Sequence, residues 1–242
     1  MNTEIGKIAI FCMEKINLEI QNTGYEFNYA SLPLCVVDSV FSIGVKYESV
    51  TNVVKNLCNY FKIKAHYKDN AAFPQRSEQL SVSEFRSMFK NLTFEQIAVE
   101  IFKNKQRTST RSGILKAEAV IKFLGVLISF KAEYFEDVNG LFENKDFESE
   151  IKKIPGQVSG ISLKYFFMLA GNDNMVKPDR MIIRFLSNIL EREVKNEECL
   201  PLLVGVSKEL NDIGYKCLTP KLLDNKIWLF QREVKPVVTK NK

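Results

Sequence analysis

The sequence predicts an all-α protein, and three observations carry that prediction. Apolar residues recur at three- and four-residue spacing through most of the chain, as they do along the buried face of a helix. Convincing alternation of apolar and polar residues, which marks a half-buried strand, is nearly absent. No Asn-Gly or Asp-Gly turn separates two runs of β-forming residues, so we expect no β-hairpin.

We expect about ten helices from this spacing. The stretches that carry it are, in chain order, 5–20, 33–45, 49–63, 81–91, 93–104, 114–130, 146–154, 161–171, 178–191, 198–215 and 219–233. Segments 22–33 and 64–80 are polar and irregular and are expected to be loops, and 234–242 is expected to be a frayed tail.

Local signals support the start of several of these helices. Pro33 suits the first turn of the second helix, because proline lacks the amide hydrogen that would be unpaired there. Ser81 precedes Glu84 by three residues, and Thr93 precedes Gln96 by three residues. Both pairs fit the capping box, in which the two side chains satisfy each other's backbone amides.

The length of 242 residues and the hydrophobic content of 45% allow one large domain or two small lobes. We expect two helical lobes with a cleft. One lobe joins residues 1–32 to 188–242, and the other is a helical barrel formed by 33–187, with a helix-hairpin-helix at 150–171. The net charge of +5 tolerates a polyanionic partner without requiring one.

Metal, membrane and export functions find no support in the composition. The five cysteines include no Cys-x-x-Cys pair and the only histidine is His66, so we expect no zinc site and no cofactor. Cys12, Cys35 and Cys58 sit in apolar surroundings typical of reduced core thiols. With no signal peptide and no run of about 18 apolar residues, we expect a cytoplasmic monomer without a membrane partner.

The stretch "IPGQVSGISLKYFFMLAG", residues 154–171, combines a tight turn with an unusually apolar helix. Gly156 and Gly160 permit positive backbone angles and the close approach of another backbone. The helix that follows begins with unpaired amides and a positive dipole end, which suits a phosphate. The residues also fit a plain packing unit of two helices, so both interpretations stay open here.

Asp179 stands between Pro178 and Arg180, where the N-cap of a helix is expected. Capping alone would explain an aspartate at this position. The preceding helix is apolar on most faces and is expected to be buried, and Gly171 ends it. A carboxylate that follows such a helix at the mouth of a loop is also well placed for chemistry.

These segments resemble the helix-hairpin-helix (HhH-GPD) DNA glycosylase superfamily, in its endonuclease III-like branch. The family hairpin reads Leu-Pro-Gly-Val-Gly, with a helix ending in Ala-Gly and then Val-Asp-Thr-His-Val-x-Arg. "IPGQVSGISLKYFFMLAG" and "VKPDRMIIRFL" are similar in the Pro-Gly, the helix length and the terminal Ala-Gly, and in Asp179 and Arg184. Upstream, "GILKAEAVI" is similar to the family's helix with Lys116 and Ala117 in place.

The resemblance implies that Asp179 is the catalytic carboxylate of a protein that cleaves an N-glycosidic bond in double-stranded DNA. It implies that backbone amides near Gly156, Val158 and Gly160 bind the DNA backbone. Basic side chains would line the path of the DNA phosphates. These are Lys153, Lys177, Arg180 and Arg184, with Arg111 and Lys116 as further candidates.

Departures from the family pattern shape the expected activity. The second hairpin glycine is replaced by Val158, with Gly160 as the alternative source of flexibility. Gly160 also aligns with the Schiff-base lysine of bifunctional members, so we expect base excision without a lyase step. The stacking glutamine aligns near Gly44, and the cysteine-rich loop of the iron–sulfur members is missing, so no cluster is expected.

Two alternatives to the enzyme remain: a non-catalytic DNA-binding or scaffold protein that retains the fold, and a protein-interaction module whose hairpin serves packing only. Three further residues attract attention. We expect Asp38 to be paired in the core, His66 to be exposed in its loop, and Trp228 to be core where the last helix packs back.

Overall fold

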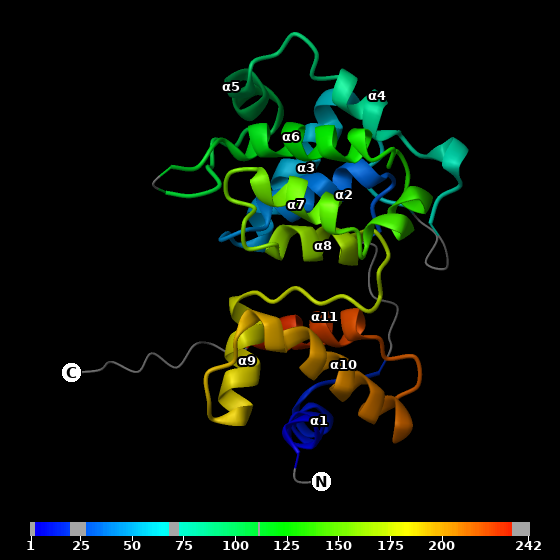
Figure 1. Ribbon diagram of the computed structural model, residues 1–242, viewed down its shortest axis with the longest axis vertical. Coiled ribbons are helices and arrows are strands. Elements are labelled where there is room, and N and C mark those ends of the chain that lie inside the picture. Colours follow the sequence, from blue (N-terminus) through cyan, green and yellow to red (C-terminus); the bar gives the residue numbers. More distant parts are fainter. Residues whose placement is uncertain (1–2, 20–27, 68–72, 111, 234–242) are drawn as a thin grey trace, which may run out of the picture. The chain divides into compact units, whose positions relative to one another are not determined.

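The computed structural model describes residues 3–19, 28–67, 73–110 and 112–233, and within them the protein is all-α (Figure 1). The described backbone forms no strand, only two isolated bridges, between Tyr29 and His66 and between Arg107 and Leu115. The predicted tail at 234–242 and much of the predicted loop at 22–33 lie outside these residues.

The chain divides into two compact units, and the boundaries differ from those expected. Unit 1 comprises residues 1–21 and 172–242, and unit 2 comprises residues 22–171. Residues 22–32 were expected in the lobe that holds both termini, and residues 172–187 were expected in the helical barrel lobe. The assignment of 172–187 is corrected because α9, Arg180–Leu190, packs against the helices of unit 1 and buries Ile182 and Phe185 among them.

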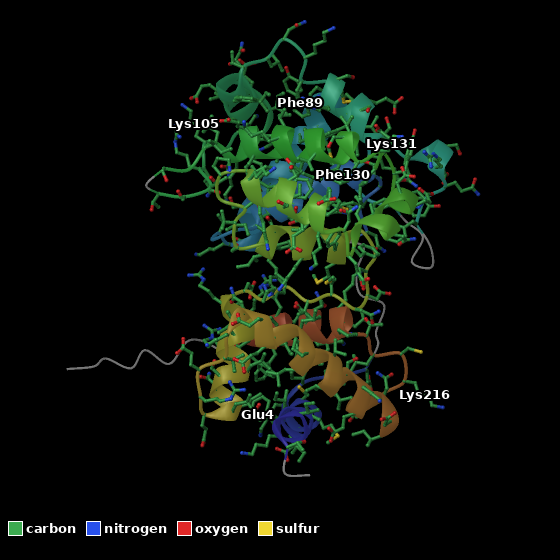
Figure 2. The ribbon with its side chains drawn as sticks, in the orientation of Figure 1. Glu4, Phe89, Lys105, Phe130, Lys131 and Lys216 are labelled. Atoms are coloured by element: carbon green, nitrogen blue, oxygen red, sulfur yellow. The ribbon has the colours of Figure 1, made fainter. Side chains whose placement is uncertain are left out.

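The described residues of unit 1 form a bundle of four helices: α1 (Glu4–Lys15), α9, α10 (Asn196–Asp212) and α11 (Pro220–Glu233). Phe185 lies in its core, and the partly buried Phe11 and Phe230 pack against that core. The three rings meet edge to face at centroid distances of 5.5 to 6.2 Å. Such aromatic contacts add to the burial of apolar area that stabilises the unit. Glu4 (labelled in Figure 2) pairs with Arg192 at 2.7 Å, which ties α1 to the residues after α9.

Unit 2 is built around α2, Leu32–Phe41, in which every residue is buried. Such a helix must be covered on all sides, and α3, α4, α6 and α8 pack against it. The helices of unit 2 after α2 are α3 (Tyr47–Phe61), η2 (Arg76–Glu78), α4 (Val82–Ser87), α5 (Phe94–Gln96), η3 (Ile97–Ile101), α6 (Lys116–Ser129), η4 (Phe135–Leu141), α7 (Lys145–Lys153) and α8 (Ile161–Leu169).

Both predicted capping boxes are confirmed. The Ser81 hydroxyl accepts from the Glu84 amide at 3.1 Å, and the Glu84 carboxylate accepts from the Ser81 amide at 3.1 Å. Thr93 and Gln96 make the same reciprocal pair at the start of α5. Local sequence alone was sufficient here because each box involves residues only three positions apart.

The described part of the chain contains no helix with both the length and the apolar character needed to cross a bilayer. Cys12, Cys35 and Cys58 are buried thiols, as predicted. Burial raises the pKa of the Cys12 and Cys58 thiols to about 12 because the apolar interior disfavours the thiolate. Both thiols are therefore inert packing groups at neutral pH.

Candidate functional site

A helix-hairpin-helix was predicted at residues 150–171, and unit 2 has a helix, a turn and a second helix there, which are α7, residues 154–160 and α8. The turn consists of two successive hydrogen-bonded bends. The Gln157 amide donates to the Ile154 carbonyl at 2.9 Å, and the Gly160 amide donates to the Gln157 carbonyl at 3.0 Å. The buried side chains of Gln157 and Ser162 hydrogen-bond to each other and close the turn against α8.

Gly156 has φ +89° and lies directly against the loop that precedes α6. A Cβ on Gly156 would stand 2.3 Å from the Cβ of Thr108. Thr108 is itself held by the bond from its amide to the Ile114 carbonyl, at 2.9 Å. The glycine is therefore required both by its backbone angle and by the close approach of a second segment.

Gly156→Ala should destabilise the protein by roughly 2–4 kcal/mol, because the strain of a positive φ adds to overpacking against Thr108. Gly160→Ala is the matched control: it has φ +68°, and its added Cβ would meet only the flexible Lys152 Cε at 3.4 Å. Urea unfolding of both variants measures the difference. Equal losses of stability in the two variants would show that the Thr108 contact contributes nothing.

Gly160 is the N-cap of α8 in the left-handed conformation, so it supplies the flexibility that Val158 cannot. Its own amide is committed to the Gln157 carbonyl, which corrects its expected place among the phosphate-binding amides. Among the described hydrogen bonds, the amides of Gly156, Val158 and Ser159 have no acceptor. Val158 is 73% exposed at the tip of the turn.

The helix that follows is buried as expected, and a carboxylate fixes it to α2. Asp38 is fully buried and accepts from the Tyr29 hydroxyl at 2.7 Å, the Ser42 hydroxyl at 2.6 Å and the Tyr165 hydroxyl of α8 at 3.4 Å. The prediction of a paired core aspartate is confirmed. Burial, together with the Asp38 charge, raises the pKa of Tyr29 well above its usual value, so the phenol stays a donor.

The lysines beside the hairpin carry partners of their own. Lys153 Nζ lies 2.5 Å from a Glu150 oxygen, and Lys152 Nζ lies 2.6 Å from a Glu148 oxygen. These exposed pairs within one helix contribute little to stability and exchange readily with another anion. Lys153 therefore stays accessible, although its charge is partly compensated.

Asp179 belongs to unit 1, where it is the N-cap of α9, as predicted. Its Oδ1 atom accepts from the amides of Met181 at 2.7 Å and Ile182 at 3.3 Å. Its backbone is extended, and the residue is half-buried. No described residue donates a hydrogen bond to Oδ2, so one oxygen is held by the helix while the other is uncommitted.

The basic residues around Asp179 differ in how they are held. Arg184 donates to the Gln231 side chain at 2.8 and 2.6 Å and is therefore turned toward α11. Arg180 is exposed, and Lys177 is half-buried. Of the predicted cations in this segment, Arg180 is the one whose side chain is exposed to solvent.

Sequence reasoning missed Asp224, a buried carboxylate on α11 that is only 5% exposed. Its Oδ2 accepts from the Lys177 backbone amide at 2.7 Å. Burial raises the pKa of Asp224 to about 7; the Lys177 amide opposes that rise and the Asp179 charge adds to it. The signal was available, since Asp224 shares the buried stripe of α11 with Leu223, Ile227 and Gln231.

Lys116, a further candidate for contact with the DNA phosphates, is buried. Lys116 is 2% exposed, and its Nζ donates to the carbonyls of Phe41 at 2.9 Å and Ile43 at 2.8 Å. It caps the end of α2, so its expected phosphate contact is corrected. Arg111 lies outside the described residues. Gly44, where the stacking glutamine was expected, has φ +72° and open space around an added Cβ.

His66 and Trp228 differ from their expected environments. His66 is half-buried and its ring stacks on Tyr29 with centroids 5.2 Å apart, so the expectation of an exposed side chain is wrong. Trp228 is half-buried rather than in the core, and the Arg232 guanidinium lies 4.6 Å from its ring centroid. No group of three or more His, Cys, Asp or Glu side chains in the described segments could hold a metal ion.

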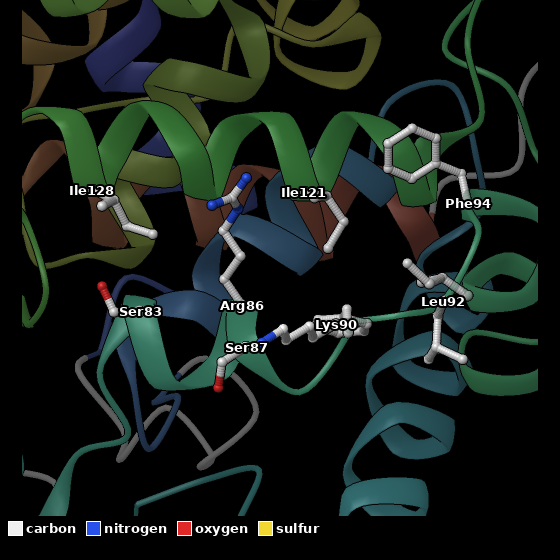
Figure 3. Close-up of a pocket in the computed structure, with 10 residues that line it drawn as sticks. Ser83, Arg86, Ser87, Lys90, Leu92, Phe94, Ile121 and Ile128 are labelled. Carbon is white, nitrogen blue, oxygen red and sulfur yellow. The ribbon is translucent and has the colours of Figure 1, made fainter.

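A cavity of about 470 Å³ lies in unit 2 between α4, α6 and the start of α5 (Figure 3). Ile121 and Ile128 of α6 face Arg86, which rises from α4 toward them. The cavity lining includes no residue of the hairpin and neither Asp179 nor Asp224. It is therefore a separate feature from the two candidate elements of the site.

The fold and the site define an all-helical protein of two units, with a glycine-bearing hairpin in one and a helix-capping aspartate in the other. Residues 7–232 match the family model described as Domain of unknown function (DUF8548), and the chain belongs to that family. No curated protein and no solved structure matches the chain.

Proposed function

We propose that the protein is a cytoplasmic, monomeric DNA-binding base-excision protein: a monofunctional DNA glycosylase of the helix-hairpin-helix (HhH-GPD) kind. In this proposal it cleaves the N-glycosidic bond of a damaged or modified base in double-stranded DNA. Asp179 is the catalytic carboxylate, and the turn of residues 154–160 contacts the DNA backbone.

The observation that carries the proposal is the shape of the turn at residues 154–160. Gly156 and Gly160 bend the backbone, and the exposed tip at Val158 leaves the neighbouring amides without acceptors among the described residues. Amides at such a turn, followed by a helix N-terminus, are suited to a phosphate oxygen. Contacts of this kind fix a protein's register on DNA without reading its sequence.

The chemistry asked of Asp179 follows from the reaction. Loss of a base leaves a cationic sugar, and a carboxylate beside that sugar stabilises the developing charge. The same carboxylate can orient and deprotonate the attacking water. Since Oδ1 is held by the Met181 and Ile182 amides, Oδ2 is the atom that we assign to both tasks. The target base must first leave the duplex stack.

Gly160 stands where bifunctional glycosylases carry a Schiff-base lysine, and it has no amine to attack the sugar. Lys164 is one helical turn further along α8. The proposed reaction therefore ends at an abasic site, with water as the nucleophile and with the DNA backbone intact.

A non-catalytic DNA-binding protein is the second candidate, and Gly44 favours it. With no side chain and open space around it, Gly44 offers nothing to fill the gap that an extruded base would leave. A protein that binds duplex DNA tightly and releases no base from any substrate would be this second candidate.

Binding to duplex DNA tests the shared part of both candidates. Raising the salt concentration from about 50 to about 200 mM should weaken binding at least about tenfold, because bound phosphates release counterions. Val158→Glu should weaken binding by a further factor of about ten or more, since it brings a negative charge to the tip. Val158→Gln is the neutral control.

A module whose hairpin serves packing alone would give a different result. It would show no salt-dependent binding to duplex DNA, and Val158→Glu and Val158→Gln would be indistinguishable. The substituted side chain is 73% exposed, so folding of both variants is expected to be unaffected.

A further inference from the structure

Asp224 is connected to Asp179 by a short and well-defined path within unit 1. The Asp224 carboxylate accepts from the Lys177 amide at 2.7 Å, and the Asp179 amide donates to the Lys177 carbonyl at 2.7 Å. Asp179 then caps α9 through its side chain. Three consecutive residues, Lys177 to Asp179, are thus held between the side of α11 and the start of α9.

We propose that Asp224 is a positioning residue for Asp179: its carboxyl group holds the Lys177 amide, and the gain or loss of its proton changes how firmly the Lys177–Asp179 segment is held. This inference rests on the proposed function for its catalytic consequence. The structural part of the inference is that Asp224 fixes the Lys177–Asp179 segment. This part depends only on the described hydrogen bonds.

The physical basis is the burial of a single carboxyl group on an otherwise apolar stripe. A buried carboxylate is costly unless strong hydrogen bonds and nearby cations compensate it. In the described structure the Lys177 backbone amide donates to Asp224. The Lys177 charge favours the ionised form of Asp224, and the Asp179 charge disfavours it. The balance raises its pKa to about 7, so its proton exchanges near neutral pH.

The other charged groups around Asp224 are accounted for. Arg184 of α9 is bonded to Gln231, and Lys221 of α11 lies 3.3 Å from Asp173. α10 also packs against α11, and the buried residues that it contributes are Cys199, Leu203, Val206, Ser207 and Leu210. The charges that act on the Asp224 carboxyl group are those of Asp179, which raises its pKa, and Lys177, which lowers it.

An amide that donates to a carboxyl group reports its ionisation, because the bond becomes charge-assisted and the amide proton moves downfield. In an NMR titration of the full-length protein from pH 5.5 to 9, the Lys177 amide should shift downfield with a midpoint near 7. Asp224→Asn keeps an acceptor oxygen but has no proton to lose in this range. The chemical shift of the Lys177 amide proton should therefore not change with pH in that variant.

The Ser81 amide is the internal control. It donates to the Glu84 carboxylate at 3.1 Å, and that hydrogen bonding, with the Ser81 hydroxyl as the largest cause, lowers the pKa of Glu84. The chemical shift of the Ser81 amide should therefore stay constant from pH 5.5 to 9. The proposal would be overturned if the chemical shift of the Lys177 amide did not change with pH in the wild-type protein. It would also be overturned if that shift changed with pH in Asp224→Asn as it does in the wild type.

Hydrogen exchange tests the positioning of Asp179 without any assay of activity. In Asp224→Ala the amides of Met181 and Ile182, which bond to Asp179 Oδ1, should exchange at least about tenfold faster. Asp224→Asn should keep their protection within about threefold of the wild type. Unchanged protection in Asp224→Ala would show that Asp224 does not position Asp179.

On a duplex that the protein processes, Asp224→Ala should lower kcat by about tenfold or more with little change in KM, and Asp224→Asn should restore most of it. A wild-type protein that releases no base refutes the proposed function but leaves the titration and exchange results intact. Active enzyme with equal kcat in the wild type and Asp224→Ala refutes the catalytic consequence alone.

Discussion

Asp179→Asn should lower the single-turnover rate of base release on the order of 10²–10³-fold while the protein stays folded. The substitution removes the negative charge that would stabilise the cationic sugar and keeps the shape of the side chain. Asparagine is as good an N-cap as aspartate, so the bonds to Met181 and Ile182 should survive. Loss of the charge at the start of α9 should cost about 0.3–1 kcal/mol.

The control for this variant is Asp173→Asn, which removes a carboxylate from the same segment. Asp173 is exposed, and its carboxylate pairs with Lys221 Nζ. Its backbone carbonyl accepts from the Lys221 amide, a bond that the substitution leaves in place. Asp173→Asn should release base at the wild-type rate. Duplex binding by Asp179→Asn should be equal to or slightly tighter than wild type, because a negative charge near the phosphates is lost. Base release at the wild-type rate by Asp179→Asn would remove this residue from the mechanism.

The free energy of unfolding should fall by up to about 4 kcal/mol between pH 4 and pH 8 through the ionisation of Asp224. The pKa of this carboxyl rises from 3.8 to about 7 in the folded protein because it is buried. Between those values the folded state binds one more proton than the unfolded state. Stability is therefore highest below pH 4 for this group and is lost as the pH rises through 7.

Asp224→Asn should abolish this component. Urea unfolding of both proteins across the pH range gives a difference curve, in which the shared contributions of the other carboxylates cancel. Glu4, Glu84, Glu148 and Glu198 have lowered pKa values and act in the opposite direction at more acidic pH. A difference curve that is flat from pH 4 to pH 8 would contradict the assigned environment of Asp224.

Helices and their caps were predictable because their causes are local. The period of apolar residues gave the helical class, and the box at Ser81 and Glu84 needs only residues within one turn. Asp179 belongs to the same group, since Pro178 and the apolar stripe after it define an N-cap without any tertiary contact. Gly160 was likewise predictable as a bend.

The unit boundary was not predictable in this way because it depends on which surface an apolar stripe meets. The stripe of α9 that buries Ile182 and Phe185 would serve either unit equally well from its spacing alone. The same applies to Gly156, whose neighbour Thr108 lies 48 positions away in the sequence. The sequence pattern indicated that Gly156 permits a close approach but not which segment approaches.

Polar and charged residues on buried stripes were the main omission in the candidate site. Asp224 and Gln231 lie among the apolar positions of α11, and their burial is tolerated because Lys177 and Arg184 donate to them. Neither donor can be inferred from the helix that carries the acceptor. Lys116 was misassigned for the same reason, since its partners are backbone carbonyls at the end of α2.

The most direct test of base excision is abasic-site formation in a panel of duplexes that each carry one modified or damaged base, with enzyme in excess. The proposed function predicts that at least one duplex breaks at the modified position only after alkaline treatment, since no lyase lysine is available. It also predicts that Asp179→Asn leaves that duplex bound and uncut. The proposal that this protein is a glycosylase would be contradicted if every duplex stayed unbroken after alkaline treatment, at protein concentrations that saturate binding.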